Sequence, residues 1–369
     1  MKVSLLDLQA QYSAIKTEVL AAVNEVLDSQ VCIGGPKVAD LEQAVARISD
    51  CAHAVGVSSG TDALLASLMA LDIGPGDEVI TTAFTFFATA GSIARVGATP
   101  VFVDIDPCTY NIDPALIRQA ITLQTKAILP VHLFGQMAEM DRIMSIAREY
   151  NLAVIEDAAQ SVTSTYYGKK AGSLGTIGCF SFFPSKNLGA AGDGGMAVTN
   201  DSALYERLML LRNHGAKPKY FHKIVGGNFR LDAIQAAILL VKLRHLDAWS
   251  EARRRNARWY DEAFRGTSVR TPAVRPYCRS VFNQYVIRVE RRAEVMNHLK
   301  ERGIGCEVYY PRPMHLQQCF EYLCYREGDC PEAERAAEEV LAIPAYPELP
   351  PEQRQFVAET ILEVTESRP

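Results

Sequence analysis

The chain has little that would tie it to a membrane, to nucleic acid or to an oxidising compartment. Its 369 residues hold no apolar run near the roughly 20 residues that cross a bilayer. Lys and Arg (38) are fewer than Asp and Glu (43), and the net charge of −5 argues against nucleic acid and anionic membranes as partners. The nine cysteines are scattered without a C-x-x-C pair, and Asp7 comes too early for a signal-peptide core. These absences together predict a cytoplasmic protein.

Several ligand-binding patterns are also missing. The phosphate loop G-x-x-x-x-G-K-[ST] is absent, which argues against a nucleoside triphosphatase. Residues 192–197 fit G-x-G-x-x-A, but a strand-like run follows them, whereas a dinucleotide fingerprint must open a helix. Cys319, Cys324 and Cys330 cluster near His315 with spacings that match no short zinc pattern, so we expect no metal.

Apolar strands alternate with helices over the first two thirds of the chain. Helical periodicity predicts two helices over 12–27 and 38–48. The pattern then predicts strands at 54–57, 78–82, 99–104, 127–133, 152–155, 177–182 and 196–199, separated by helices at 62–71, 89–96, 114–120 and 140–150. Many of these strands are apolar on both faces, as buried parallel strands are. The sequence therefore predicts a doubly wound α/β sheet that binds its ligand at the carboxyl ends of the strands.

The pattern of apolar strands that alternate with helices ends after Leu231. A long helix is predicted from residue 233 into the charged stretch that ends near 258. Beyond it, strand signals at 282–289 and 307–310 predict a smaller α+β region. We therefore divide the chain into a large α/β domain over 1–245 and a small C-terminal domain over 246–369.

Lys186 stands in an unusual setting, between an aromatic run with a proline and a cluster of glycines. Such surroundings limit the solvation of an amine, which lowers its pKa and makes it a nucleophile for Schiff-base chemistry. Asp157 follows the apolar run 152–155, and a buried carboxylate there needs a partner. A lysine with a strand-end carboxylate suggests pyridoxal phosphate, whose ring nitrogen takes an acid partner. On this segment alone, a helix N-cap is an equal alternative for Asp157.

Other segments allow two interpretations each. Residues 58–64 follow a strand and open a helix, so Gly60 and Thr61 could cradle a phosphate or Ser59 could simply cap the helix. Phe86 at a strand end could stack on a flat ring or pack in the core. The stretch 226–232 could bind an anion or form a capped turn, and 309–315 could line a pocket or pack as a loop.

Taken in order, five segments give a specific resemblance that covers essentially the whole chain. They are S-G-T-D-A-L, E-D-A-A-Q, F-S-F-F-P-S-K-N-L-G, G-D-G-G and N-F-R-L-D-A-I-Q-A-A. The set resembles the sugar aminotransferases of the DegT/DnrJ/EryC1/StrS family. The resemblance implies fold type I of the pyridoxal phosphate enzymes, with a mostly parallel seven-stranded sheet flanked by helices in the large domain.

The resemblance also implies a role for individual residues. Lys186 would form the Schiff base and move the proton, Asp157 would keep the ring nitrogen protonated, and Gln160 would approach the ring hydroxyl. The remaining implied contacts are to the cofactor for Gly60, Thr61, Asp62, Phe86, Ser181 and Asn228, and to the substrate for Arg230, Tyr310 and His315. Asn228 would reach the cofactor from the neighbouring subunit, which implies a homodimer with shared active sites.

The implied substrates are L-glutamate as amino donor and a keto-sugar linked to a nucleoside diphosphate. Residues 103–114 and 225–228 look more like the members that aminate C3, and a UDP-linked 3-keto N-acetylated hexose is the favoured acceptor. A dTDP-linked 3-keto-6-deoxyhexose and a 4-keto-sugar are alternatives. Sugar dehydratases of the family have histidine in place of the lysine, and a non-catalytic regulator could have lost Lys186, Asp157 or Ser181, so the sequence favours an aminotransferase.

Overall fold

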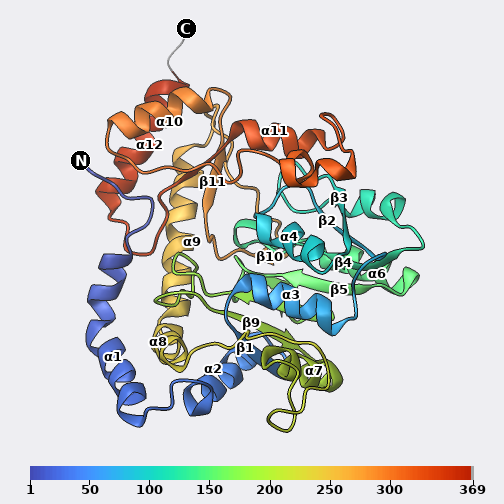
Figure 1. Cartoon of the computed structure of the whole chain (residues 1–369). Helices are drawn as coiled ribbons and strands as arrows, with labels where there is room; N and C mark the ends of the chain where they lie inside the picture. Colours follow the sequence, from blue (N-terminus) through green and yellow to red (C-terminus); the bar gives the residue numbers. More distant parts are fainter. Residues whose placement is uncertain (367–369) are drawn as a thin grey trace.

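A seven-stranded sheet forms the centre of the molecule in the computed structural model, which describes residues 1–366 (Figure 1). Its strands are arranged in the order β1 (His53–Val57), β9 (Gly195–Thr199), β8 (Ile177–Ser181), β5 (Ala153–Asp157), β4 (Thr125–Leu129), β2 (Glu78–Thr82) and β3 (Thr99–Val103). β9 is antiparallel to both of its neighbours, and the other strand pairs are parallel. This confirms the predicted mostly parallel seven-stranded sheet.

Both faces of the sheet are buried under helices. One face packs against α3 (Gly60–Ala70), α4 (Phe87–Arg95) and α7 (Ser202–Arg212), and the other against α2 (Gly35–Ile48), α6 (Met140–Tyr150) and α8 (Ala233–Leu243). Neighbouring strand residues belong to different cores, as Val154 and Ile155 do, because side chains alternate along a strand. The short α5 (Pro114–Ile117) precedes β4, and β10 (Cys278–Arg279), β6 (Thr165–Tyr166) and β7 (Lys169–Lys170) form a small separate sheet.

Helix α1 (Leu8–Ser29) lies along the side of the molecule and packs on α8. Ile15 and Val19 bury themselves against Ile238 and Val241. The residues before α1 run to the opposite end of the molecule, where Val3 forms a parallel bridge with Ile304. The N-terminus therefore packs with the C-terminal part of the chain.

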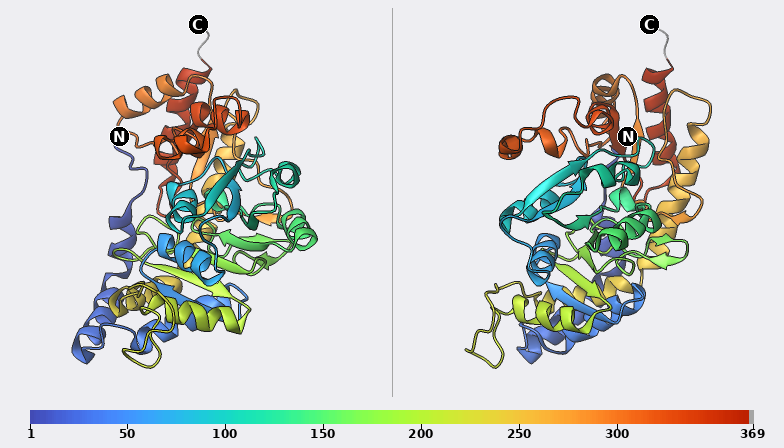
Figure 2. Two further views of the ribbon diagram at one scale, coloured as in Figure 1. Left: turned by 45° about the vertical axis from the view of Figure 1, so that its right-hand side comes forward. Right: turned by 90° about the vertical axis from the view of Figure 1, so that its right-hand side faces the viewer.

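The C-terminal part has a hydrophobic core of its own. It contains α9 (Leu246–Ala263), α10 (Arg292–Glu301), α11 (Pro331–Glu339), α12 (Pro351–Thr365) and the antiparallel pair β11 (Tyr285–Arg288) and β12 (Val340–Ile343). Figure 2 shows that α10 and α12 lie at the end of the molecule opposite α2 and α7. The division near residue 245 stays a prediction.

Two predicted elements differ from the structure, and the helices α7, α10, α11 and α12 were not predicted individually. The long helix from 233 is two helices, since α8 ends at Leu243 and α9 begins at Leu246. The strand at 307–310 is reduced to a single bridge between Glu307 and Ala342. Helix α7 lies in a stretch for which no element was predicted. Within residues 1–366 no helix is long and apolar enough to span a membrane, and no cluster of side chains suits a metal ion.

Candidate active site

A cavity of about 560 Å³ opens at the carboxyl ends of the central strands. The start of α3, the ends of β5 and β8, the loop after β8 and the segment around Tyr310 contribute to its wall. Eight predicted site residues line it, namely Gly60, Thr61, Phe86, Asp157, Gln160, Ser181, Lys186 and Tyr310. Parallel strands end at one edge of the sheet, which explains how residues from distant parts of the sequence meet there.

Lys186 belongs to a turn after β8 that is held in place by three hydrogen bonds. Its backbone N–H donates to the carbonyl of Phe183 (2.9 Å). The Asn187 side chain donates to the carbonyl of Val281 (2.9 Å), and Nζ of Lys242 on α8 donates to the carbonyl of Gly189 (2.7 Å). Burial lowers the pKa of Lys186 from 10.5 to about 8, against the opposing effect of the Asp157 charge. A substantial fraction of the amine is therefore neutral and nucleophilic near physiological pH.

Asp157 ends β5 and is buried. Its carboxyl accepts hydrogen bonds from Oγ1 of Thr89 (2.8 Å) and from the backbone N–H of Ala159 (3.1 Å). Burial raises the pKa of Asp157, while these hydrogen bonds and the positive charge of Lys186 act in the opposite direction. A cationic partner in the cavity would stabilise the ionised carboxylate further.

The N-terminus of α3 meets the end of β8 at the cavity wall. Ser59 caps the helix, because its Oγ accepts from the backbone N–H of Asp62 (3.0 Å). A Cβ on Gly60 would lie 2.6 Å from Cβ of Ser181, so only glycine lets the two elements approach this closely. Asp62 is absent from the cavity wall, and its Oδ2 accepts from the hydroxyls of Ser58 (2.6 Å) and Ser59 (2.9 Å). Free backbone N–H groups at such a helix start bind anions.

Gln160 links two parts of the cavity wall. Its Oε1 accepts from the backbone N–H of Phe134 (2.6 Å), and its Nε2 donates to the hydroxyl of Tyr310 (3.1 Å). The ring of Tyr310 lies 6.2 Å from that of Phe86, which is largely exposed. The two aromatic side chains make part of the wall apolar.

Besides Asp62, three further predicted residues do not line this cavity. Asn228 is exposed, and its backbone forms an isolated antiparallel β-bridge with Asn213. Nη1 of Arg230 donates to Oδ1 of Asn213 (2.9 Å). His315 is buried, with Nε2 2.9 Å from Oε1 of Glu334. The structure of one chain therefore brings none of the three to Lys186.

Sequence reasoning missed several residues of the cavity wall, and it missed Thr89, which lies outside the wall and contacts Asp157. Thr89 follows Thr85 by one helical turn, and that spacing was the only signal for its contact with Asp157. Gln284 lines the cavity, and within residues 1–366 its buried Oε1 has no hydrogen-bond partner. The other polar groups in the wall that were not predicted as site residues are Ser59, Thr85, Ser185, Asp193 and Tyr309.

A lysine of lowered pKa, a buried strand-end carboxyl and a helix N-terminus around one cavity define the class as the pyridoxal phosphate enzymes of fold type I. The chain belongs to the DegT/DnrJ/EryC1/StrS aminotransferase family, whose model matches residues 13–362.

Similar proteins include both enzymes and one protein named for regulation. A "pleiotropic regulatory protein" of Geobacillus stearothermophilus is 53% identical and covers 98% of both chains. A UDP-N-acetyl-3-dehydro-alpha-D-glucosamine 3-aminotransferase of Acidithiobacillus ferrooxidans is 46% identical, with 97% of both chains covered. A dTDP-3-amino-3,4,6-trideoxy-alpha-D-glucose transaminase of Streptomyces venezuelae is 41% identical over 99% of this chain and 97% of that one.

Solved structures give the same result. DesV of S. venezuelae, in complex with a ketimine intermediate, superposes with a TM-score of 0.98 at 40% identity, and all of both chains is covered. NtdA of Bacillus subtilis, with bound cofactor PMP, has a TM-score of 0.93 at 33% identity over 99% of this chain and 86% of that one. The chain is therefore a PLP-dependent sugar aminotransferase.

Proposed function

We propose that the protein transfers the amino group of L-glutamate to C3 of a UDP-linked 3-keto N-acetylated hexose. The observation that carries this proposal is the pairing of Lys186 and Asp157 in one cavity. The lysine has a pKa lowered to about 8, and the buried carboxyl interacts with its charge. A nucleophilic amine and a buried acid are the two groups that amino transfer through pyridoxal phosphate requires.

The residues of the cavity fit this cofactor. Its phosphate matches the N–H groups at the start of α3 beside Ser181, where a side chain at position 60 would take up the space. Its ring nitrogen matches the buried carboxyl of Asp157, and its aldehyde matches the amine of Lys186. Gln160 and Gln284 offer amide groups to polar substituents, and the exposed ring of Phe86 offers a stacking surface. When bound, pyridoxal phosphate supplies the electron sink that makes the α-proton of the amino donor acidic.

The residues of this chain then have distinct tasks. With the cofactor held in the cavity, Nζ of Lys186 in its neutral form would accept the α-proton of the donor as a base and then return a proton as an acid. The carboxylate of Asp157 would hold the proton on the ring nitrogen of the cofactor. The same lysine performs the reverse transfer for the keto-sugar, so the kinetics are ping-pong.

The nature of the sugar rests on residues 103–114 and 225–228 and on the relatives. The relative that is 46% identical is named for a UDP-linked 3-keto substrate, and this supports the proposed acceptor. The S. venezuelae relative is named for a dTDP-linked product and supports the alternative of a dTDP-linked 3-keto-6-deoxyhexose.

Incubation of the purified protein with glutamate and a panel of UDP- and dTDP-linked 3-keto and 4-keto sugars tests the proposal. We expect amination of the UDP-linked 3-keto N-acetylated hexose with the highest kcat/KM, and no turnover by the Lys186→Ala variant. A Lys186→Ala protein that still deaminates glutamate would sink the mechanism. Preference for a dTDP-linked sugar would replace the proposed acceptor and leave the mechanism intact.

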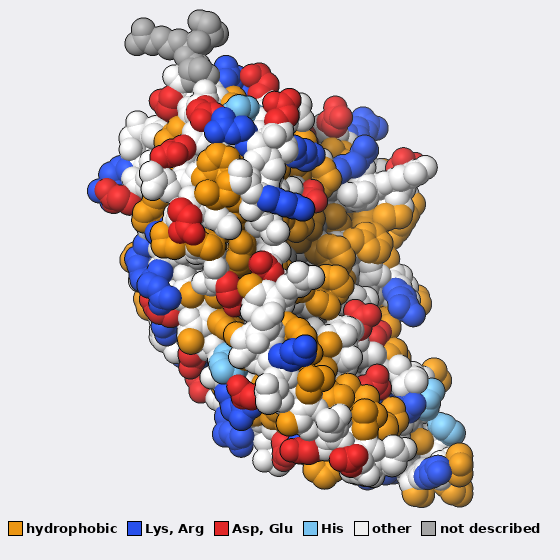
Figure 3. Space-filling model, turned by 90° about the vertical axis from the view of Figure 1, so that its left-hand side faces the viewer, with side chains coloured by type: hydrophobic (Ala, Val, Ile, Leu, Met, Phe, Trp, Pro, Cys, Tyr) orange, Lys and Arg blue, Asp and Glu red, His pale blue; other side chains and the backbone are white. Residues whose placement is uncertain are grey.

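We further propose that the active protein is a homodimer whose cavities are completed by the partner. Asn228 and Arg230 lie outside the cavity of their own chain, although a family resemblance assigns them to a cofactor and substrate site. Large apolar side chains are exposed beside the cavity at Phe86 and Phe183, and further along the chain at Val225. Figure 3 shows hydrophobic side chains gathered in a hollow on the side of the molecule where α1 lies. Such surfaces are typical of subunit contacts.

A further inference from the structure

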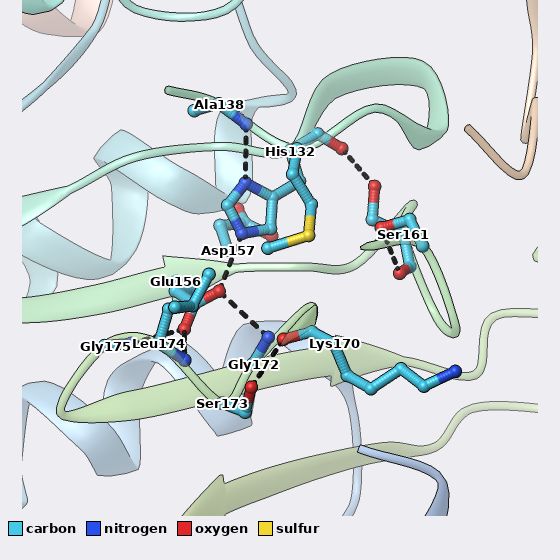
Figure 4. Close-up of polar contacts among 12 residues, drawn as sticks. His132, Ala138, Glu156, Asp157, Ser161, Lys170, Gly172, Ser173, Leu174 and Gly175 are labelled. Carbon is cyan, nitrogen blue, oxygen red and sulfur yellow. Dashed lines mark hydrogen bonds and ion pairs between the residues drawn. The ribbon is translucent and has the colours of Figure 1, made fainter. Parts of the chain in front are cut away.

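Glu156 and His132 form a fully buried pair next to Asp157 (Figure 4). Nε2 of His132 lies 2.8 Å from Oε2 of Glu156, and neither side chain is accessible to solvent. Glu156 precedes Asp157 on β5, so their side chains point to opposite faces of the sheet. Neither residue lines the cavity, and the proposed mechanism uses neither of them.

The hydrogen bonds of the pair fix the tautomer of His132. The carboxylate of Glu156 accepts backbone N–H groups from Gly172 (2.9 Å), Leu174 (2.8 Å) and Gly175 (2.5 Å). Nδ1 of His132 accepts the N–H of Ala138 (3.2 Å), so that nitrogen carries no proton. Nε2 therefore carries the proton and donates it to Glu156. Every nitrogen and oxygen of the two side chains therefore has a hydrogen-bond partner.

The backbone ties this pair to Asp157. The N–H of His132 donates to the carbonyl of Asp157 (2.9 Å), and the N–H of Asp157 donates to the carbonyl of Pro130 (2.9 Å). Oγ of Ser161 also donates to the carbonyl of His132 (2.7 Å). Backbone hydrogen bonds therefore hold both the N–H and the carbonyl of Asp157. On the other face of the sheet, the His132 side chain binds Glu156, the residue before Asp157.

Glu156 also binds the turn that precedes β8, the strand before Lys186. The turn 172–175, which Glu156 binds, comes directly before β8, and β8 ends at Ser181. A Cβ on Gly175 would lie 2.7 Å from the carbonyl of Val154. The turn therefore packs tightly on β5, and Glu156 joins the strand of the carboxylate to the strand that precedes the lysine.

We propose that Glu156 and His132 are positioning residues. They hold the Asp157 carboxyl at the place where it meets the ring nitrogen of the cofactor, and they fix its position relative to the turn that carries Lys186. The proposal rests on the role proposed above for Asp157. Groups that orient a directly binding residue commonly change its affinity for the ligand about 10- to 100-fold when removed, as they do in metal sites.

The test compares His132→Ala with His132→Gln, whose amide nitrogen can still donate to Glu156. Binding of pyridoxal phosphate to apoprotein is measured by fluorescence quenching, together with the absorption spectrum of the bound cofactor. We expect the alanine variant to bind at least about tenfold more weakly, with a shifted absorption band, because one lost hydrogen bond to a charged group has that size of effect. The glutamine variant should recover most of the affinity and the normal band.

Glu339→Gln is the matched control, because it removes the negative charge from another ion pair, that of Glu339 with the buried Arg288 (2.7 Å), at a position outside the cavity. It should lower the melting temperature without changing cofactor affinity. Wild-type affinity and spectrum in His132→Ala, or an equal loss of affinity in Glu339→Gln, would overturn the proposal. If His132→Ala does not fold, Ser161→Ala replaces it, with an expected loss of about threefold, and an unchanged affinity there is equally contrary. Failure of the wild-type protein to bind the cofactor would instead count against the proposed function.

Discussion

Two effects on the pKa of Lys186 oppose each other. Burial disfavours the charged ammonium, whereas the Asp157 carboxylate favours it, and burial is the larger effect, so the pKa falls to about 8. A fully exposed lysine would be almost entirely protonated at pH 7 and a poor nucleophile. The structure therefore gives Lys186 both a nucleophilic form and a protonated form close to physiological pH, and proton transfer in two directions needs both.

The titration of Lys186 can be measured on the apoprotein. Labelling with an amine-reactive reagent, followed by mass spectrometry of the peptide, should reach half of its maximal rate at about pH 8. The neutral amine reacts, so the rate rises with pH through the folded-state pKa. In Lys186→Arg this labelled site should be absent. A midpoint near the ordinary lysine value of 10.5 would show that the side chain is solvated.

The same shift has a consequence for stability. The folded protein loses this proton at about pH 8 and the unfolded chain at about 10.5, so the unfolded state binds more protons between these values. The contribution of Lys186 to the free energy of unfolding therefore rises with pH across this window. Relative to Lys186→Met in urea denaturation of apoprotein, the wild type should gain about 1–3 kcal/mol between pH 8 and 10.

At the level of elements, the contact between the start of α3 and the end of β8 shapes the proposed phosphate site. Gly60→Ala places a Cβ 2.6 Å from Cβ of Ser181 and must separate the two elements. We expect a loss of about tenfold or more in affinity for pyridoxal phosphate, and little change for pyridoxal, which has no phosphate. Fluorescence titration of apoprotein with both ligands measures this difference.

Gly74→Ala is the control for that experiment, because its Cβ would meet nothing closer than 3.7 Å. It should bind both ligands as the wild type does. An equal loss of pyridoxal and pyridoxal phosphate affinity in Gly60→Ala would mean that the substitution disturbs the whole cavity and not the phosphate site alone.

The seven strands of the central sheet could be predicted because most of their residues are buried and they read as continuous apolar runs. Helix α7 was missed because only two of its residues, Leu208 and Leu211, are buried, which gives a weak periodicity. The break between α8 and α9 has no proline or glycine to signal it. Residues 307–310 are rich in β-formers, but their pairing depends on where β12 lies.

The site was predictable to the extent that its residues directly follow strands. Gly60, Asp157 and Lys186 meet in the cavity because parallel strands end at one edge. Thr89 and Gln284 were missed because their contacts depend on how a helix and the C-terminal part pack onto that edge. The same holds for the contact between His132 and Glu156, since nothing in the sequence marks two residues 24 positions apart as a pair.

At the scale of the whole molecule, the cavity of one chain holds Lys186 and lacks Asn228. The loop that carries Asn228 and Arg230 lies outside that cavity, and apolar side chains next to the cavity are open to solvent. The proposed two-fold symmetric dimer would account for both facts, because it would cover the same surface on each subunit and place two residue sets in reciprocal contact. Each active site would then contain Lys186 from one subunit and Asn228 from the other.

Subunit complementation tests this arrangement directly. Lys186→Ala and Asn228→Ala dimers should each have little activity. When they are dissociated, mixed in equal amounts and reassembled, half of the dimers are mixed, and one of their two sites holds both native residues. Activity should therefore return to about one quarter of the wild-type value per subunit, by counting sites in a two-fold dimer. A mixture of two Lys186 variants, Lys186→Ala and Lys186→Arg, is the control and should recover nothing. If both residues act within one chain, the first mixture should be as inactive as its components, and an active monomer in sedimentation would lead to the same conclusion.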